Sequence, residues 1–345
     1  MAFTRKDFIK KTALLGTAGM AFSTAGCTIE SESPSVPNSQ KIKPQPLKPG
    51  DTLGLVAPAS PIYQSSVFDQ MLVDLKALGF QLKLGEHVRS QRGYLAGTDE
   101  ERSSDLMAMF RDDTVDAIMC IRGGWGCNRI LPLLDYEEIR RNPKLLIGFS
   151  DITSLHMALY TQSDLISFHG PVGKSVWTDF TKEAFQSITE KGTPSLFMIP
   201  SEFDDSFVVN SGKSRGRLFG GNLSVLSSMV GSGYLPSFKG AILFLEDIGE
   251  SVYRIDRMLT QLKLAGILDE LSGFVFGKCT DCSAGNNSLS LEQMLDDHIK
   301  PLGIPAFYGA MISHEDDNIT LPIGIEAEID ADNRTIQLLE SGVAV

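Results

Sequence analysis

Short apolar runs alternate with amphipathic segments in the first part of the chain. Residues 65–79 carry apolar side chains at helical spacing, and Thr98-Asp99-Glu100-Glu101 has the form of a capping box that starts a helix ending near Phe110. The apolar runs have the composition of buried strands, and they lie at residues 51–57, 80–84, 117–121 and 145–147. This alternation predicts a doubly wound, flavodoxin-like α/β domain with a mainly parallel sheet over residues 50–200.

The pattern changes after residue 200. Polar residues gather at Asp204-Asp205 and Asn210-Ser211-Gly212, which indicates a linker over residues 201–215. Beyond it, an apolar run at 241–245 and a helical pattern at 253–264 are followed by several short strand-like segments. We therefore expect a second domain, a β-rich α+β unit, over residues 216–345.

The first 49 residues resemble neither domain. Basic residues precede a short apolar stretch that ends at Thr24-Ala25-Gly26-Cys27, which is typical of a signal peptide over residues 1–27 with a lipobox-like end. Cys27 would then carry a lipid, with plain secretion as the alternative, and Arg5-Lys6 leaves both the twin-arginine and the general export route open. Residues 28–49 are rich in serine and proline and are predicted to form a solvated tether. The chain is thus expected to be an exported lipoprotein that faces the periplasm or cell exterior and meets the membrane only through its anchor.

Charge and cysteine content narrow the possible partners. The formal net charge is −12, so nucleic acid is not an expected partner. Five cysteines are irregularly spaced, and Cys279-Thr280-Asp281-Cys282 is a lone Cys-x-x-Cys without a second ligand pair. We interpret it as structural or incidental, and no metal or cofactor is expected.

The turn Gly148-Phe149-Ser150-Asp151 follows the apolar run 145–147 and precedes a helical pattern. Many hydrolases present a nucleophilic serine on such a strand–turn–helix, with the free N–H groups of the helix aimed at the developing oxyanion. The glycine expected two residues after the serine is Ile152 here. A helix cap at Ser150, with Asp151 at the positive end of the helix, is an equally good interpretation of these residues alone.

A glycine-rich loop, Arg122-Gly123-Gly124-Trp125-Gly126, directly follows the apolar run 117–121. Glycines allow backbone N–H groups to approach a ligand closely, so this loop could supply an oxyanion donor next to Ser150. The lysine and the spacing of a phosphate-binding P-loop are missing. A glycine-rich turn of purely structural use is the alternative.

An acid and a base for such a serine are less clearly marked. Glu246 ends the apolar run 241–245, where a buried charge needs a partner, but Asp247 and Glu250 are rivals and a solvated strand end is an alternative. Of the five histidines, His169 and His314 lie in loops after apolar segments, and spacing alone does not choose between them. His314 is slightly favoured because it completes a Ser–Glu–His order along the chain. The remaining histidines are His87, His156 and His298.

Taken together, these segments resemble the LD-carboxypeptidase family of serine peptidases, the muramoyltetrapeptide carboxypeptidases. The resemblance starts near residue 50 and extends to the end of the chain. The matching stretches, in order, are Ala57-Pro58-Ala59-Ser60, Arg122-Gly123-Gly124-Trp125-Gly126, Gly148-Phe149-Ser150-Asp151-Ile152-Thr153, Phe168-His169-Gly170-Pro171, Gly220-Gly221-Asn222-Leu223, Leu245-Glu246-Asp247, and His314 followed by Leu321-Pro322-Ile323-Gly324.

The resemblance implies a role for each of these residues. Ser150 would be the nucleophile, His314 the general base and Glu246 the residue that orients the histidine. The backbone N–H of Asp151, with that of Gly123 or Gly124, would form the oxyanion hole. Candidate pocket residues are Trp125, His169 and Asn222.

The implied reaction releases terminal D-alanine from cell-wall (murein) tetrapeptides by cleaving the bond after the L-centre of a diamino acid. The implied fold is an amino-terminal α/β domain and a second, β-rich domain with the triad between them, and members are often homodimers. His314 departs from the family pattern because Ser313 and Glu315 flank it where glycines are expected. One alternative is an immunity peptidase of the same family, which cleaves toxic peptide–nucleotide conjugates. An alternative of another class is a lipid-anchored solute-binding protein, which would not need a converging serine, histidine and glutamate.

Overall fold

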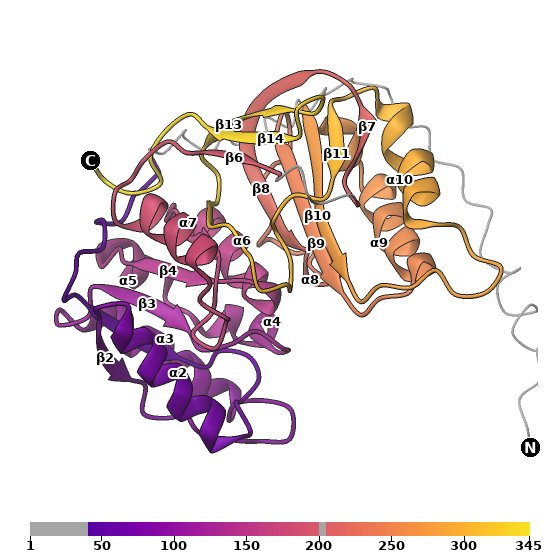
Figure 1. Cartoon of the computed structure of the whole chain (residues 1–345). Coiled ribbons are helices and arrows are strands. Elements are labelled where there is room, and N and C mark those ends of the chain that lie inside the picture. Colours follow the sequence, from indigo (N-terminus) through magenta and orange to yellow (C-terminus); the bar gives the residue numbers. More distant parts are fainter. Residues whose placement is uncertain (1–40, 200–204) are drawn as a thin grey trace, which may run out of the picture. The chain divides into compact units, whose positions relative to one another are not determined.

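The computed structural model describes residues 41–199 and 205–345 (Figure 1). The predicted signal peptide, Cys27 and most of the predicted tether lie outside these described residues.

The first sheet has the strand order β12-β5-β4-β3-β1-β2. Its five parallel strands are β1 (Thr52–Val56), β2 (Gln81–Leu84), β3 (Ala117–Cys120), β4 (Leu145–Gly148) and β5 (Phe168–His169). Read from β2 to β5, this is the flavodoxin-like order 2-1-3-4-5, so the predicted fold class is confirmed. In such sheets ligands bind at the carboxyl ends of the strands where the strand order reverses, here between β1 and β3.

Helices connect these strands, as the sequence pattern predicts. At the start of α3 the Thr98 hydroxyl accepts from Glu101 N, and the Glu101 carboxylate accepts from Thr98 N, which completes the predicted capping box. Within the described residues no helix is both long and apolar enough to cross a membrane. The helices and 3₁₀ turns of this half are α2 (Ser65–Ala77), α3 (Asp99–Arg111), α4 (Cys127–Ile130), η1 (Leu131–Leu133), α5 (Tyr136–Arg141), η2 (Ser150–Ile152), α6 (Thr153–Gln162) and α7 (Asp179–Thr189).

The second sheet has the order β6-β14-β13-β8-β9-β10-β11-β7 (Figure 1). Its strands are β6 (Leu196–Met198), β7 (Phe207–Asn210), β8 (Lys213–Asn222), β9 (Ile242–Ile248), β10 (Gly273–Thr280), β11 (Ala306–Tyr308), β13 (Glu326–Asp330) and β14 (Thr335–Leu338). The four central strands, β8 to β11, are parallel, whereas the flanking strands pair antiparallel. The second domain therefore has a parallel α/β centre inside the β-rich unit that the sequence predicts. Its helices and 3₁₀ turns are α8 (Leu223–Ser228), α9 (Val252–Leu264), η3 (Leu268–Glu270), α10 (Leu291–Ile299) and η4 (Lys300–Leu302).

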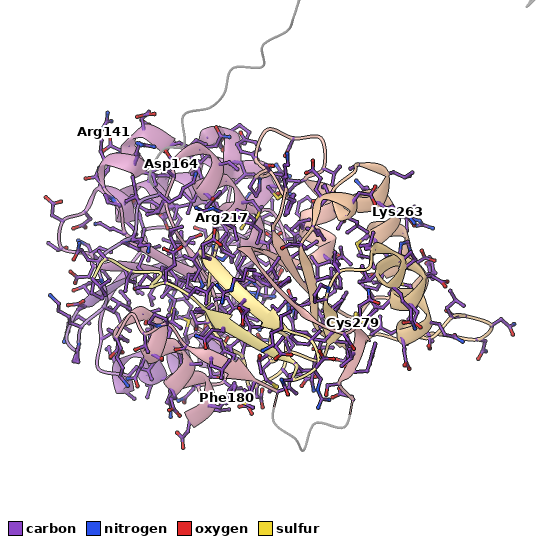
Figure 2. The ribbon with its side chains drawn as sticks, turned by 90° about the horizontal axis from the view of Figure 1, so that it is seen from above. Arg141, Asp164, Phe180, Arg217, Lys263 and Cys279 are labelled. Atoms are coloured by element: carbon purple, nitrogen blue, oxygen red, sulfur yellow. A yellow bond between two sulfur atoms is a disulfide. The ribbon has the colours of Figure 1, made fainter. Side chains whose placement is uncertain are left out.

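The boundaries differ from the expected ones in three places. Residues 41–49, expected in the tether, pack on the first domain: Ile42 pairs with Leu165, and Lys41 forms an ion pair of 2.6 Å with Asp164, which also binds Arg140 (Figure 2). The expected linker 201–215 contains β7 and the start of β8. Two strands also change sheets, because β6 pairs with β14 and β12 (Leu321–Pro322) pairs with β5. Apolar residues among the polar ones explain the first difference, since Leu47 is only 2% exposed.

The end of β8 lies directly against the start of α6. Asn222 N donates to Thr153 Oγ1 at 2.9 Å, and a Cβ on Gly221 would lie 2.3 Å from that same oxygen. Asn222 pairs in register with Glu246 on β9. This close packing brings the carboxyl ends of β8 and β9 to the turn that follows β4.

Candidate active site

Ser150 occupies a strained turn directly after β4. Its φ is +63°, in the left-handed region that residues other than glycine rarely adopt. Such a conformation costs on the order of 1–3 kcal/mol and persists only where the surroundings impose it. The caps of η2 and α6 are Phe149 and Ile152, and neither makes a side-chain cap hydrogen bond. The interpretation of Ser150 as a helix cap is therefore wrong.

Asp151 lies in the first turn of η2, at the positive helix end as expected, and its side chain also contacts α4. Its Oδ2 accepts from Cys127 N at 2.8 Å, so the carboxylate joins the Ser150 turn to the start of α4. Burial raises the pKa of Asp151. Its backbone remains part of the turn that presents Ser150.

The glycine-rich loop lies in direct contact with Ser150. A Cβ placed on Gly123 would lie 2.8 Å from Ser150 Cβ and 3.0 Å from its Oγ, so only glycine allows this approach. Gly124 has φ +118°, and a Cβ there would lie 2.4 Å from Ser60 Oγ. Ser60 holds the loop from the end of β1, because its hydroxyl accepts from Trp125 N at 3.1 Å. The ends of β1 and β3 thus position the loop beside the serine.

Glu246 and His314 form a hydrogen-bonded pair. His314 Nδ1 lies 2.7 Å from Glu246 Oε2, and Glu246 on β9 is completely buried. Asp247 is instead held by Ser224 and Asn222, while Glu250 pairs with Arg254. Of the three acids at this strand end, only Glu246 contacts the histidine.

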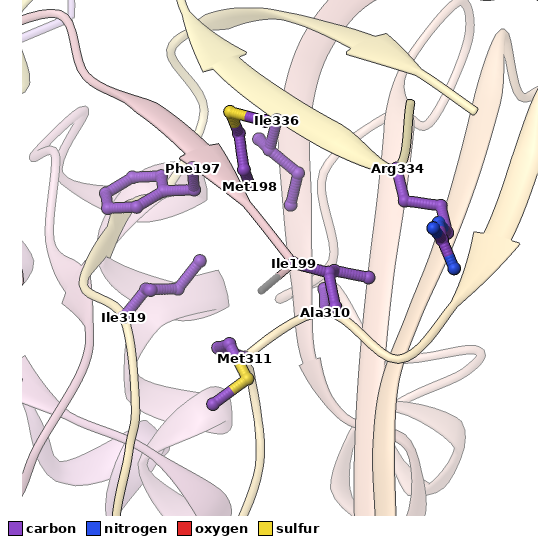
Figure 3. A pocket seen from close by; sticks show the side chains of 8 residues that line it. All are labelled: Phe197, Met198, Ile199, Ala310, Met311, Ile319, Arg334 and Ile336. Carbon is purple, nitrogen blue, oxygen red and sulfur yellow. The ribbon is translucent and has the colours of Figure 1, made fainter. Parts of the chain in front are cut away.

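The loop that carries His314 is closed at its base and anchored on both sides. Ile319 N donates to Met311 O at 2.9 Å, and the Met311 and Ile319 side chains lie with apolar residues of β6 and β14 around a small pocket (Figure 3). Further along, the Thr178 hydroxyl, at the start of α7, donates to Asp317 at 2.6 Å. These contacts hold the His314 loop against β6 and β14 of the second sheet and against the start of α7.

One open pocket of about 460 Å³ contains both Ser150 and His314. Gly123, Gly124 and Phe149 also line it, and the Phe149 and His314 rings lie 4.8 Å apart. Glu246 lies behind His314, away from the pocket surface. A hydroxyl, a carboxylate-paired imidazole and a close glycine loop thus meet at the carboxyl ends of β3 and β4, the edge of the sheet where such folds bind ligands.

Comparison with known proteins agrees with this geometry. Sequence models of the LD-carboxypeptidase N-terminal and C-terminal domains match residues 53–170 and 215–329. A probable murein peptide carboxypeptidase of Bacillus subtilis is 40% identical over 314 residues, which cover 89% of this chain and 97% of that protein. The chain belongs to the LD-carboxypeptidase family. The resemblance expected from the sequence is confirmed.

Solved structures extend the similarity to the fold. The muramoyltetrapeptide carboxypeptidase of Oxalobacter formigenes has a TM-score of 0.72 and 30% identity, with 83% of this chain and 97% of that one covered. The microcin C7 self-immunity protein MccF, solved with glutamyl sulfamoyl guanosine, has a TM-score of 0.82 and 28% identity, with 88% and 100% covered. Both of these solved structures thus share the architecture of this chain.

Three candidate pocket residues lie outside the pocket of this LD-carboxypeptidase. Trp125 is 54% exposed and packs edge-on against Tyr94. Asn222 is buried and caps α8, where its side chain accepts from Val225 N and donates to Asp247. His169 is fully buried among aromatic rings behind Phe149. The expectation that these side chains line the pocket is wrong.

The other histidines have structural environments. His156 is buried and bonds Ser167 Oγ and Gly148 O, both at 2.8 Å, so it supports the end of β4 from below. His87 and His298 pair with Asp105 and Asp256 away from the pocket. Among the histidines, His314 alone lines the pocket with Ser150.

Four features of the structure, three of them at the pocket, were not predicted from the sequence. Arg122 and Lys174 line the pocket, Glu315 beside His314 pairs with Lys278 at 3.1 Å, and Cys279 forms a disulfide with Cys282 (Figure 2). Glu315 is one of the two residues beside His314 at which the sequence departs from the family pattern, and its side chain forms this ion pair. The cysteine spacing was the only signal for the disulfide. Nothing in the linear pattern placed Lys174 near Ser150.

Acid is expected to destabilise the protein through its buried histidines. Burial lowers the pKa of His156 from 6.5 to about 4 and lowers the pKa of His169 well below its usual range. Between pH 6.5 and pH 4 the unfolded chain binds a proton at His156 that the folded chain does not bind. The free energy of unfolding therefore falls as the pH drops from about 6.5 to about 4. The shift at His156 alone corresponds to roughly 3 kcal/mol. Urea denaturation at a series of pH values measures this slope.

His169→Phe is the matched variant for that measurement. Neither ring nitrogen of His169 has a hydrogen-bond partner among residues 41–199 and 205–345, so phenylalanine keeps the ring packing and removes one proton-binding site of the unfolded chain. The variant is expected to show a shallower slope than the parent protein. Equal slopes in the two proteins would contradict the assignment of His169 as a buried neutral group.

Proposed function

We propose that the protein is a serine-type carboxypeptidase that releases terminal D-alanine from murein tetrapeptides. The observation that carries this proposal is the single pocket in which the strained Ser150 faces the same space as His314, with Glu246 bonded behind the imidazole. The murein and muramoyltetrapeptide carboxypeptidases named above support the substrate class. The scissile bond joins the L-centre of the diamino acid to D-alanine.

The chemistry follows from the three side chains. Glu246 accepts a hydrogen bond from Nδ1–H of His314, which leaves Nε2 unprotonated to take the proton of Ser150 as its hydroxyl oxygen attacks the scissile carbonyl. Backbone N–H groups of Asp151 and of Gly123 or Gly124 would stabilise the negative oxygen of the tetrahedral intermediate. His314 then returns the proton to the departing D-alanine amine. Water, deprotonated by the same imidazole, hydrolyses the acyl-enzyme.

Glu246→Gln is expected to reduce kcat by about 10³- to 10⁴-fold, because a neutral amide no longer stabilises the imidazolium or fixes the required tautomer. Glu250→Gln is the matched control, since Glu250 forms its ion pair with the exposed Arg254 and does not contact His314. The measurement is D-alanine release from the free and the disaccharide-linked tetrapeptide. Comparable kcat values for the two variants would remove Glu246 from the mechanism.

A second candidate function is cleavage of peptide–nucleotide conjugates. The TM-score of 0.82 with MccF favours it. Glutamyl sulfamoyl guanosine and the tetrapeptide can be compared as substrates of one preparation. A higher kcat/KM for the nucleoside conjugate would favour the immunity function, whereas tight binding without turnover of either would favour a receptor.

We further propose that the enzyme acts outside the inner membrane as a lipoprotein. Residues 1–27 support export because basic residues precede an apolar stretch and a lipobox-like end. The Cys279–Cys282 disulfide also supports it, because disulfides persist in oxidising compartments. Cys27→Ser is expected to move the protein from the membrane fraction to the soluble fraction of lysed cells. Continued membrane association of that variant would contradict the lipid anchor.

A further inference from the structure

Two cationic side chains line the pocket beside the nucleophile. Arg122 precedes Gly123, and its Nε and Nη1 donate to Gly123 O at 3.2 Å and to Pro61 O at 2.9 Å. Lys174 lies on the segment that follows β5, and its backbone N donates to Ile121 O, next to Arg122, at 3.0 Å. Both positions are therefore fixed by the end of β3.

Neither cation has an acidic partner within the described parts of the chain. No carboxylate of residues 41–199 or 205–345 lies within ion-pair distance of Arg122 or Lys174. Lys278, by contrast, is paired with Glu315 and Asp205. Arg122 is half-buried whereas Lys174 is exposed, and partial desolvation by the surrounding protein, together with the charge of Arg122, lowers the pKa of Lys174. Two like charges in one pocket of a chain with net charge −12 would be relieved by a bound anion.

Two acidic residues line the same pocket, and one of them, Glu315, is paired with Lys278. Glu315 and Asp316 follow His314 and also line the pocket. A carboxylate ligand is therefore repelled near these acids and attracted toward Arg122 and Lys174. Charge alone gives the bound substrate a direction.

We propose that Arg122 and Lys174 form the subsite that binds the terminal carboxylate of the substrate. The inference rests on the proposed function, because a carboxypeptidase must recognise a free carboxylate one residue beyond the scissile bond. One residue spans about 3.8 Å, so that carboxylate must bind close to the nucleophile. Arg122 is suited to this role, because it lines the pocket of Ser150 and its Nε donates to the carbonyl oxygen of Gly123, the residue that lies against the serine. Guanidinium and ammonium groups are the usual partners of such carboxylates.

Lys174→Met gives the cleaner test, because Arg122 also holds Gly123 and Pro61, whereas the Lys174 ammonium makes no hydrogen bond or ion pair with another described residue. The variant is expected to raise KM for the tetrapeptide about 10- to 100-fold with little change in kcat, as loss of a charge-assisted hydrogen bond predicts. Lys174→Arg should restore most of the affinity. Lys239→Met removes the same charge at an exposed position outside the pocket and should leave KM unchanged.

The deciding comparison pairs each variant with two substrates, the tetrapeptide and the same peptide ending in D-alaninamide. The parent protein and Lys174→Met should differ on the free acid and behave alike on the amide. The subsite assignment is overturned if amidation raises KM by the same factor in both proteins. It is also overturned if the difference in KM between the two proteins disappears only when another carboxylate of the peptide is amidated. Failure of the parent protein to release D-alanine from the tetrapeptide would instead overturn the proposed function, so the two failures are distinguishable.

Discussion

Ser150→Ala is expected to lower kcat for D-alanine release by about 10⁴- to 10⁶-fold, while Ser150→Gly does the same and makes the protein more stable. Both substitutions remove the attacking oxygen. Alanine keeps the Cβ that makes φ +63° costly, whereas glycine adopts this conformation freely. The glycine variant should therefore gain about 1 kcal/mol in free energy of unfolding, and the alanine variant should stay within about 0.5 kcal/mol of the parent protein.

Release of D-alanine and urea denaturation, measured on the same preparations, test this pair of variants. The two measurements separate a nucleophile held in strain from a serine that merely shapes the turn. Substantial activity in either variant would exclude Ser150 as the nucleophile. A glycine variant no more stable than the alanine variant would show that the turn stores no strain.

Gly123→Ala is expected to reduce kcat/KM by about 10²- to 10³-fold, the size of effect seen when an oxyanion donor is lost. The added methyl would lie 2.8 Å from Ser150 Cβ and 3.1 Å from Phe149 O, so either the serine or the loop must move. Gly233→Ala is the matched control, because no atom lies within 4 Å of a Cβ built there. Steady-state kinetics on the tetrapeptide measure both variants.

The same pair of glycine variants also distinguishes a local change in the active site from a general loss of folded protein. Gly123→Ala should remain folded at 25 °C, with a lower free energy of unfolding than Gly233→Ala. Unchanged kcat/KM in folded Gly123→Ala would mean that the loop does not act on the reacting carbonyl. It would also remove the main reason for placing the oxyanion hole there.

The strand–turn–helix at Ser150 could be predicted because its local pattern is strong. Leu145-Leu146-Ile147 forms β4 and the helical pattern after the turn forms α6, as expected. The missing glycine at Ile152 has a structural reason: a Cβ on Gly148 would lie 2.9 Å from Ile152 Cγ1, so the strand glycine provides the space that the isoleucine fills. The strand and the helix start can therefore pack closely because the small residue is Gly148 on the strand and not a glycine at position 152.

The convergence of the site could not be read from the chain, because it depends on contacts between distant segments. Glu246 and His314 are separated by 68 residues, and only the register of β9 and the anchored loop after Met311 bring them together. His169 shows the opposite error. It belongs to a motif next to the site, but it packs against the ring of Phe149, and Phe149 rather than His169 lines the pocket. A sequence motif does not reveal whether a side chain is buried.

The most direct test of the central claim uses two tetrapeptides that differ only in the configuration of the last alanine. The account predicts that the parent protein releases D-alanine from the D-terminal peptide, that the L-terminal peptide is cleaved far more slowly, and that Ser150→Ala, folded as judged by its denaturation curve, releases neither. Release of D-alanine at the parent rate by Ser150→Ala, or no release from the D-terminal peptide by the parent protein, would contradict it.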